Sequence, residues 1–277
     1  NQVAFGPRVP NSKAHKQCGD YLAAELTRFG AQLYVQEANL KAYDGTLLEA
    51  RNLIGSYNPE QSKRVLLFAH WDSRPYSDHD PDPANLRKPL EGADDGASGV
   101  GVLLAIARQL GQQAPNIGVD ILFCDAEDYG TPEFVDDYQP DTWCLGSQFW
   151  AKNPHVKNYK AEFGILLDMV GGKGATFFRE FQSMRSAAPI VEMVWSKARD
   201  LGYGKFFINA DGGAITDDHQ YVISGRGIPS IDIINYDPDT ETGFASYWHT
   251  QKDNMDNIDR ETLQAVGQTV LEVIYNQ

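Results

Sequence analysis

Apolar residues along this chain form short unbroken runs, separated by stretches in which they recur at helical spacing. The run at 65–69 is apolar at every position and the run at 118–124 is nearly so, whereas a half-exposed strand would alternate. Both runs therefore predict strands that are covered on both faces. Further strands are expected at 161–168, 206–209 and 229–234.

Apolar residues three and four positions apart predict amphipathic helices between these strands. The first helix runs from a cap at Ser12 to about Phe29, and Gly30 ends it. Later helices are expected at 97–110, 186–201 and 260–275, with a short one beginning over 146–151.

The fold class follows from the order of these elements. Residues 31–38 and 49–57 predict an antiparallel pair of strands joined through a turn at Gly45. Strands and helices then alternate, which is typical of an α/β fold. No linker divides the 277 residues. We predict a single domain over 1–277, with a central twisted sheet that is mixed, mostly parallel and flanked by helices.

Two long segments fit neither pattern. Residues 73–91 are polar and contain four prolines, which predicts an ordered loop. Because this loop lies between His70 and Asp95 in the sequence, we expect it to cover the active site. A second irregular insertion is expected from Tyr129 to Trp143.

Charge and cysteine content limit the partners and the chemistry. The net charge of −14 argues against nucleic acid or an anionic membrane as partner, since both require a basic face. No apolar run approaches the ~20 residues of a membrane span. Three cysteines are too few for a disulfide framework. Cys124 could pair with Cys144, or all could be free thiols, and both alternatives stay open.

Ionisable side chains gather where predicted strands end. They are His70, Asp72, Asp95, Glu127, Asp128 and Asp168, and His249 follows much later. Any one carboxylate could simply cap a helix or face solvent. Together they indicate a site, because ligands of α/β sheets bind at the carboxyl ends of the strands. Carboxylates with one or two imidazoles suit a catalytic zinc ion.

The order of these residues resembles that of the zinc-dependent aminopeptidase superfamily. Within it, the chain is most similar to the glutaminyl cyclases of the animal type and their bacterial relatives. The motifs that carry this resemblance are the run from His70 to Arg74, the run Asp217-Asp218-His219, and Trp248 before His249-Thr250. The resemblance implies a zinc aminopeptidase-like fold.

The resemblance also implies roles for individual residues. One zinc would be bound by Asp95, Asp128 and His249. Glu127 would be the general acid and base, with Asp168 and Asp217 in a carboxylate network beside it. Trp248 would line the substrate pocket.

Three departures from the animal pattern stand out. Asp128 occupies a position where Glu is usual, and Asp232 falls where the animal enzymes have His. The insertion from Tyr129 to Trp143 has no Trp at the place expected for a pocket-lining residue.

The activity implied is conversion of the N-terminal glutamine of a peptide or protein to pyroglutamate, with release of ammonia. Zinc can polarise the side-chain carbonyl, and Glu127 can move the proton from the attacking amine to the leaving nitrogen. Acidic neighbours can bring the pKa of Glu127 toward working pH. The resemblance further implies export, to the periplasm or outside the cell, and we expect a monomer.

Two other functions compete with this one. In a two-zinc aminopeptidase, His70 and Asp168 would bind a second zinc, Asp95 would bridge the metals, and Glu127 would activate water. The ligand residues alone do not separate the two enzymes. A binding domain without activity is the third hypothesis, and the presence of Glu127 argues against it.

Overall fold

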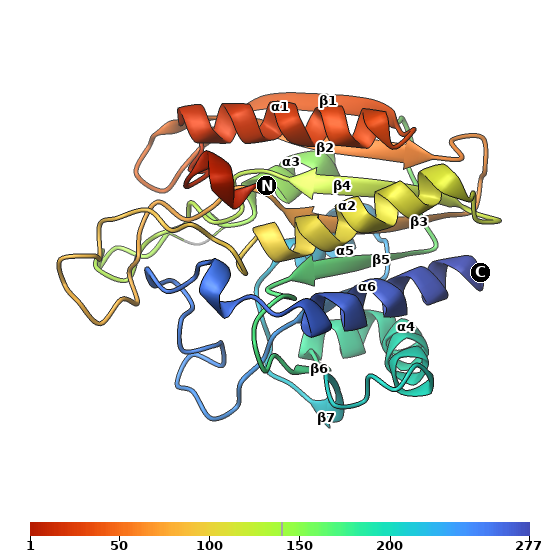
Figure 1. Cartoon of the computed structure of the whole chain (residues 1–277). Helices are drawn as coiled ribbons and strands as arrows, with labels where there is room; N and C mark the ends of the chain where they lie inside the picture. Colours follow the sequence, from red (N-terminus) through yellow and green to blue (C-terminus); the bar gives the residue numbers. More distant parts are fainter. Residues whose placement is uncertain (140) are drawn as a thin grey trace.

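A six-stranded sheet with the strand order β1-β2-β4-β3-β5-β8 forms the centre of the computed structural model, which describes residues 1–139 and 141–277 (Figure 1). The strands are β1 (Gln32–Lys41), β2 (Leu47–Tyr57), β3 (Arg64–His70), β4 (Gly118–Cys124), β5 (Phe163–Asp168) and β8 (Ser230–Ile234). β1, β2 and β4 pair antiparallel, and β4, β3, β5 and β8 pair parallel. The predicted mixed, mostly parallel sheet is confirmed.

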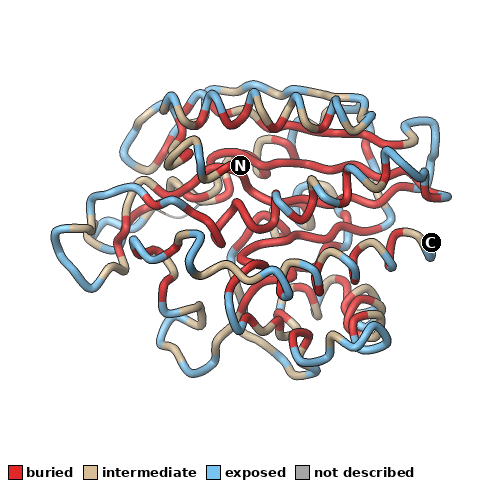
Figure 2. The backbone as a smooth tube through the Cα atoms, viewed as in Figure 1, coloured by how far each residue is buried: buried red, intermediate tan, exposed pale blue. Residues whose placement is uncertain are grey.

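Helices cover both faces of this sheet. One layer consists of α1 (Lys13–Arg28), α2 (Ala97–Gln112), α4 (Phe181–Asp200) and α6 (Arg260–Tyr275). α3 (Leu145–Lys152) and α5 (Asp218–Arg226) pack on the other face. Every residue of β3, β4 and β5 is buried between the layers, as the red central strands of Figure 2 show. Burial on both faces explains why these strands are apolar without alternation.

Some elements differ from the sequence prediction. A separate parallel pair, β6 (Phe177–Arg179) and β7 (Phe207–Asp211), forms a second small sheet, of which only β7 was predicted. α4 begins at Phe181, five residues before the predicted start, because Glu180 caps it. A kink at Ala187 precedes Pro189 and divides the helix, so its apolar pattern is not continuous. α5 was not predicted, because its nine residues are too few to show a clear apolar stripe.

The cysteines are all free and buried, so Cys124 and Cys144 do not pair. Two short 3₁₀ helices, η1 (Val3–Phe5) and η2 (Met255–Asn257), complete the described elements.

Gly99 sets how closely α2 can approach the sheet. A Cβ atom at this position would lie 2.1 Å from the backbone oxygen of Leu167 in β5. We therefore expect Gly99→Ala to lower the free energy of unfolding by about 1–3 kcal/mol, the usual cost of overpacking. Gly101→Ala, on the exposed side of the same helix, is the matched control and should raise stability by about 0.4–1 kcal/mol. Urea unfolding of both variants tests this, and equal effects of the two would contradict it.

Candidate functional site

The carboxyl ends of the parallel strands lie at the left-hand end of the sheet in Figure 1. Residues at and after these ends line one cleft. The cleft has a volume of about 450 Å³. It is lined by all seven residues to which the sequence assigned roles, Asp95, Glu127, Asp128, Asp168, Asp217, Trp248 and His249. The predicted site residues are therefore together in space, although they come from five different segments of the chain.

Strained backbone surrounds this cleft. Ala126, Met169 and His249 have positive φ angles of 52°, 48° and 52°. Such a left-handed conformation costs a non-glycine residue about 1–3 kcal/mol and persists where the surrounding structure enforces it. The first two lie beside Glu127 and Asp168, so sharp turns at the ends of β4 and β5 direct these side chains into the cleft.

Asp95, Asp128 and His249 form a group with the spacing of metal ligands. His249 Nε2 lies 3.5 Å from Asp95 Oδ2 and 3.4 Å from Asp128 Oδ1. Ligand atoms at about 2.0–2.1 Å from a tetrahedral zinc lie about 3.3 Å from one another. Asp128 Oδ2 is buried and has no hydrogen-bond partner in the described part of the chain. The donor set, its spacing and this unpaired oxygen fit a zinc ion.

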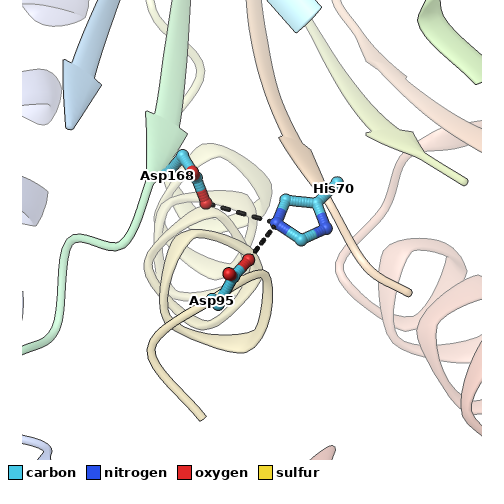
Figure 3. A group of neighbouring side chains, drawn as sticks. All are labelled: His70, Asp95 and Asp168. Atoms are coloured by element: carbon cyan, nitrogen blue, oxygen red, sulfur yellow. Dashed lines mark hydrogen bonds and ion pairs between the residues drawn. The ribbon is translucent and has the colours of Figure 1, made fainter. Parts of the chain in front are cut away.

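His70 contacts Asp95 of this group and also Asp168, as Figure 3 shows. Its Nε2 lies 2.9 Å from Asp95 Oδ1 and forms a 3.2 Å hydrogen bond with Asp168 Oδ1. Burial lowers the pKa of His70, but Asp168, Asp72 and Asp95 together raise it well above its usual value. The two oxygens of Asp95 thus face different partners, Oδ1 toward His70 and Oδ2 toward His249. The atoms of His70, Asp95 and Asp168 are also close enough to hold a metal ion.

Two buried carboxylates hold the backbone of the acidic residues in place. Asp72 accepts hydrogen bonds from the backbone N–H groups of Glu127 and Asp128, at 3.1 and 3.2 Å. Asp253 accepts from those of Asp94 and Asp95, at 2.7 and 3.2 Å. Asp253 could not be identified from the sequence, because its partners lie 159 and 158 residues away. Outer hydrogen bonds of this kind fix the orientation of metal ligands.

The 73–91 loop packs beside the ligand residues, and none of its residues lines the cleft. Arg74 contacts Asp128 Oδ1 at 3.2 Å and forms a buried ion pair with Asp78. Asp78 Oδ1 in turn lies 3.5 Å from His249 Nδ1. The prediction that this loop covers the cleft is therefore wrong. The loop instead contacts two of the ligand residues, Asp128 and His249, through Arg74 and Asp78.

Glu127 lies in a low-dielectric, acidic environment. Burial raises the pKa of its carboxyl group well above its usual value, His70 lowers it, and Asp128 and Asp217 raise it further. Cys144 donates a hydrogen bond from Sγ to Glu127 Oε1 at 2.9 Å. Glu127, Cys144 and Asp217 offer donor atoms within 4.8 Å of one another. A carboxyl group with a raised pKa can exchange a proton near neutral pH.

Aromatic side chains form the wall beside His249. Trp248 stacks on the imidazole at 3.7 Å between ring centroids, and Trp143 lies parallel to it at 6.3 Å. Trp143 lines the cleft, and the sequence did not identify it. Trp143 is the last residue of the predicted insertion, and only the folding of the chain brings it to the cleft.

Residues 52–274 match the model of peptidase family M28. This match covers most of the chain and includes every residue of the metal-ligand group. The chain belongs to peptidase family M28.

Solved structures similar to this chain include a Zn-dependent exopeptidase and a glutaminyl cyclase. The chain resembles a Zn-dependent exopeptidase from Parabacteroides distasonis at 81% identity, covering 100% of this chain and 95% of that one, with a TM-score of 0.99. It resembles the glutaminyl cyclase of Tannerella forsythia at 71% identity, with the same coverages and a TM-score of 0.98. Zinc-dependent M28 peptidases and glutaminyl cyclases thus share this fold.

A curated relative is more distant in sequence. Over 251 residues, the chain is 27% identical to the glutaminyl-peptide cyclotransferase of Bos taurus, which covers 80% of this chain and 64% of that protein. The chain therefore spans less than two thirds of the length of this relative. Among the described helices, none combines the length and apolar character required to cross a membrane.

Further buried acidic residues, Asp232 and Glu180, adjoin the cleft on the side of Asp168 and Asp217. Asp232 is 1% exposed, and neither carboxylate oxygen has a hydrogen-bond partner in the described residues. Burial raises its pKa well above the usual value, and Asp217 and Asp168 raise it further. His219 Nδ1 lies 3.7 Å from Asp232 Oδ2, and its Nε2 lies 3.3 Å from Glu180 Oε2.

Glu180 is expected to make stability depend on pH. Burial raises the pKa of its carboxyl group, but His219 and the N–H groups of Gln182 and Ser183 lower it to about 2, from 4.5. The charged form is therefore favoured by folding. The charged Glu180 carboxylate adds at most about 3 kcal/mol to the free energy of unfolding. This stabilisation is complete above pH 4.5 and is lost as the pH falls toward 2.

Unfolding of Glu180→Gln at several pH values tests this expectation. The variant should be less stable than the parent at pH 7, and the difference should shrink as the pH falls below 4.5. Glu261→Gln, at an exposed position in the first turn of α6, is the control and should show little change. A difference that stays constant from pH 7 to pH 3 would contradict the assignment.

Proposed function

We propose that this chain is a zinc-dependent glutaminyl-peptide cyclotransferase, with one zinc bound by Asp95, Asp128 and His249. The observation that carries the proposal is the division of the two Asp95 oxygens between His249 and His70. In the one-zinc arrangement, Asp95 Oδ1 keeps its 2.9 Å contact with His70 Nε2, and Oδ2, on the side of His249, binds the metal. Similarity to the Tannerella forsythia glutaminyl cyclase at 71% identity supports the same function.

The reaction joins the α-amine nitrogen of an N-terminal glutamine to its own side-chain carbonyl carbon and breaks the bond from that carbon to the amide nitrogen, which leaves as ammonia. Zinc, when bound, supplies Lewis acid polarisation of the carbonyl. Glu127 takes the proton from the attacking amine and gives it to the leaving nitrogen, a role that its raised pKa suits.

The other residues bind and orient the substrate. Burial raises the pKa of Asp217 well above its usual value, and that of Asp168 to about 6, so both carboxyl groups can hold a proton near neutral pH. They can then accept or donate hydrogen bonds beside Glu127. Trp248 and Trp143 provide apolar surfaces that hold the glutamine side chain and exclude water.

A two-zinc aminopeptidase is the second candidate. The observation in its favour is that His70, Asp95 and Asp168 offer three donor atoms within 4.8 Å, beside the first group and sharing Asp95. The similar Zn-dependent exopeptidase of Parabacteroides distasonis also agrees with it. A binding domain without activity needs no residue in the position of Glu127.

A single assay separates these candidates. We expect a peptide beginning with Gln to release ammonia and yield a pyroglutamyl peptide of unchanged chain length. The same peptide beginning with Ala should remain intact. Mass spectrometry and an ammonia assay measure both outcomes. Release of free glutamine or alanine would contradict the cyclase function and support the aminopeptidase. No reaction with either peptide would favour the binding domain.

Export to the periplasm or the exterior and a monomeric state remain predictions for this chain. The physiological substrates are proposed only as peptides or proteins with N-terminal glutamine.

A further inference from the structure

A second cleft adjoins the first and has a volume of about 550 Å³. The two clefts share Tyr138, Trp143 and Thr216 as lining residues. These shared residues place the second cleft directly beside the candidate active site. A molecule that extends out of the first cleft past Trp143 therefore enters the second.

Residues of α4 and α5 form the sides of this second cleft. Gln182, Arg185 and Ser186 lie three and four positions apart on α4, so they share one face of that helix. Gln220, Tyr221 and Ser224 come from α5. The polar side chains of both helices suit a peptide, whose backbone needs hydrogen-bond partners.

The two clefts differ in charge. The first is lined by six carboxylates and by no lysine or arginine among the described residues. The second is lined by one cation, Arg185, and one acid, Asp141, which accepts a hydrogen bond from Tyr221 at 3.3 Å. Arg185 is exposed. The arginines in ion pairs among the described residues are others, namely Arg28, Arg51, Arg64, Arg74 and Arg179.

We propose that the second cleft binds the substrate residues that follow the N-terminal glutamine, and that Arg185 selects an acidic side chain there. This inference rests on the proposed cyclase function. The glutamine and its amino group occupy the acidic first cleft, and the rest of the peptide must leave it. An extended chain advances about 3.3–3.6 Å per residue, so the positions directly after the glutamine are those that reach the shared lining residues and the second cleft.

The expected preference is modest, because Arg185 is exposed to solvent. Ion pairs of this kind contribute about 0.2–1 kcal/mol, which corresponds to a factor of about 1.4–5 in KM. The preference should appear in KM, since Arg185 lies in the second cleft and does not line the first, where the reacting atoms are placed. Added salt should weaken it by screening.

The test uses amidated peptides that begin with Gln and carry Glu, Gln or Lys at position 2, 3 or 4. With the parent protein, Glu at one or more of these positions should lower KM relative to Gln, and Lys should raise it, with similar kcat. Arg185→Glu should reverse this order. Arg199→Glu makes the same charge change fourteen residues further along α4 and should leave the order unchanged.

The outcomes distinguish the two proposals. Cyclisation of all peptides with no dependence on Glu or Lys would overturn the subsite and leave the cyclase function intact. A preference for Glu that persists in Arg185→Glu would also overturn the role of Arg185. If the parent protein cyclises none of the peptides, the cyclase function fails and the subsite with it.

Discussion

Glu127→Gln is expected to lower kcat for cyclisation by about 10²–10⁴-fold, the usual contribution of a general acid–base group. The amide has the shape of the carboxylate and can still accept the hydrogen bond from Cys144, which joins Sγ to Glu127 Oε1 at 2.9 Å. It cannot take the proton of the attacking amine. The loss should therefore appear in kcat, while the site keeps its shape.

Zinc content and folding distinguish this loss from a structural one. Glu127 does not belong to the Asp95, Asp128 and His249 group, so the variant should hold as much zinc as the parent. Its thermal unfolding should also be similar. Glu272→Gln, on α6, makes the same chemical change far along the chain and serves as control. Unchanged turnover in Glu127→Gln would remove this residue from the mechanism, and loss of zinc would make it a ligand.

His249→Ala is expected to remove the bound zinc and, with it, the activity. Its Nε2 completes a set of three ligand atoms spaced at 3.4 and 3.5 Å. Alanine leaves only Asp95 and Asp128, and two carboxylates do not form the three-ligand set of a catalytic zinc site. Metal analysis of the purified parent should find about one zinc per chain, and analysis of the variant close to none.

The zinc content of His70→Gln, compared with that of the parent, tests whether the protein binds one zinc or two. Glutamine keeps an N–H donor for Asp95 and Asp168, which now contact His70 Nε2 at 2.9 and 3.2 Å. In the one-zinc enzyme this variant should keep its zinc at about the parent level. If the parent binds two zincs and His70→Gln binds one, His70 is a ligand, and the two-zinc aminopeptidase is the better description.

Residues whose roles depend on local sequence were largely predictable. Asp168 closes a continuous apolar run, so its place at the end of a buried strand could be inferred from the pattern alone. His70 closes β3 in the same way. Because parallel strands present their carboxyl ends at one edge, the convergence of these residues also followed from the sequence.

Residues whose roles depend on the path of a loop were not predictable. Trp143 reaches the cleft, and Asp253 accepts hydrogen bonds from Asp94 and Asp95, only because distant segments fold back on the site. The 73–91 loop illustrates the same limit, since its position in the sequence suggested a cover and its packing made it a support for Asp128 and His249.

The sequence by itself determined the α/β class, the positions of the buried strands along the chain and the acidic and histidine residues at their ends, because each of these rests on patterns within a few neighbouring residues. The tertiary structure decided which residue faces which, as in the division of the Asp95 oxygens between His70 and His249. It also decided that a second cleft adjoins the first at Trp143. Such contacts depend on differences of about 1 Å between atoms that are far apart in the chain, as Asp95 and His249 are, and no local pattern specifies distances of that kind.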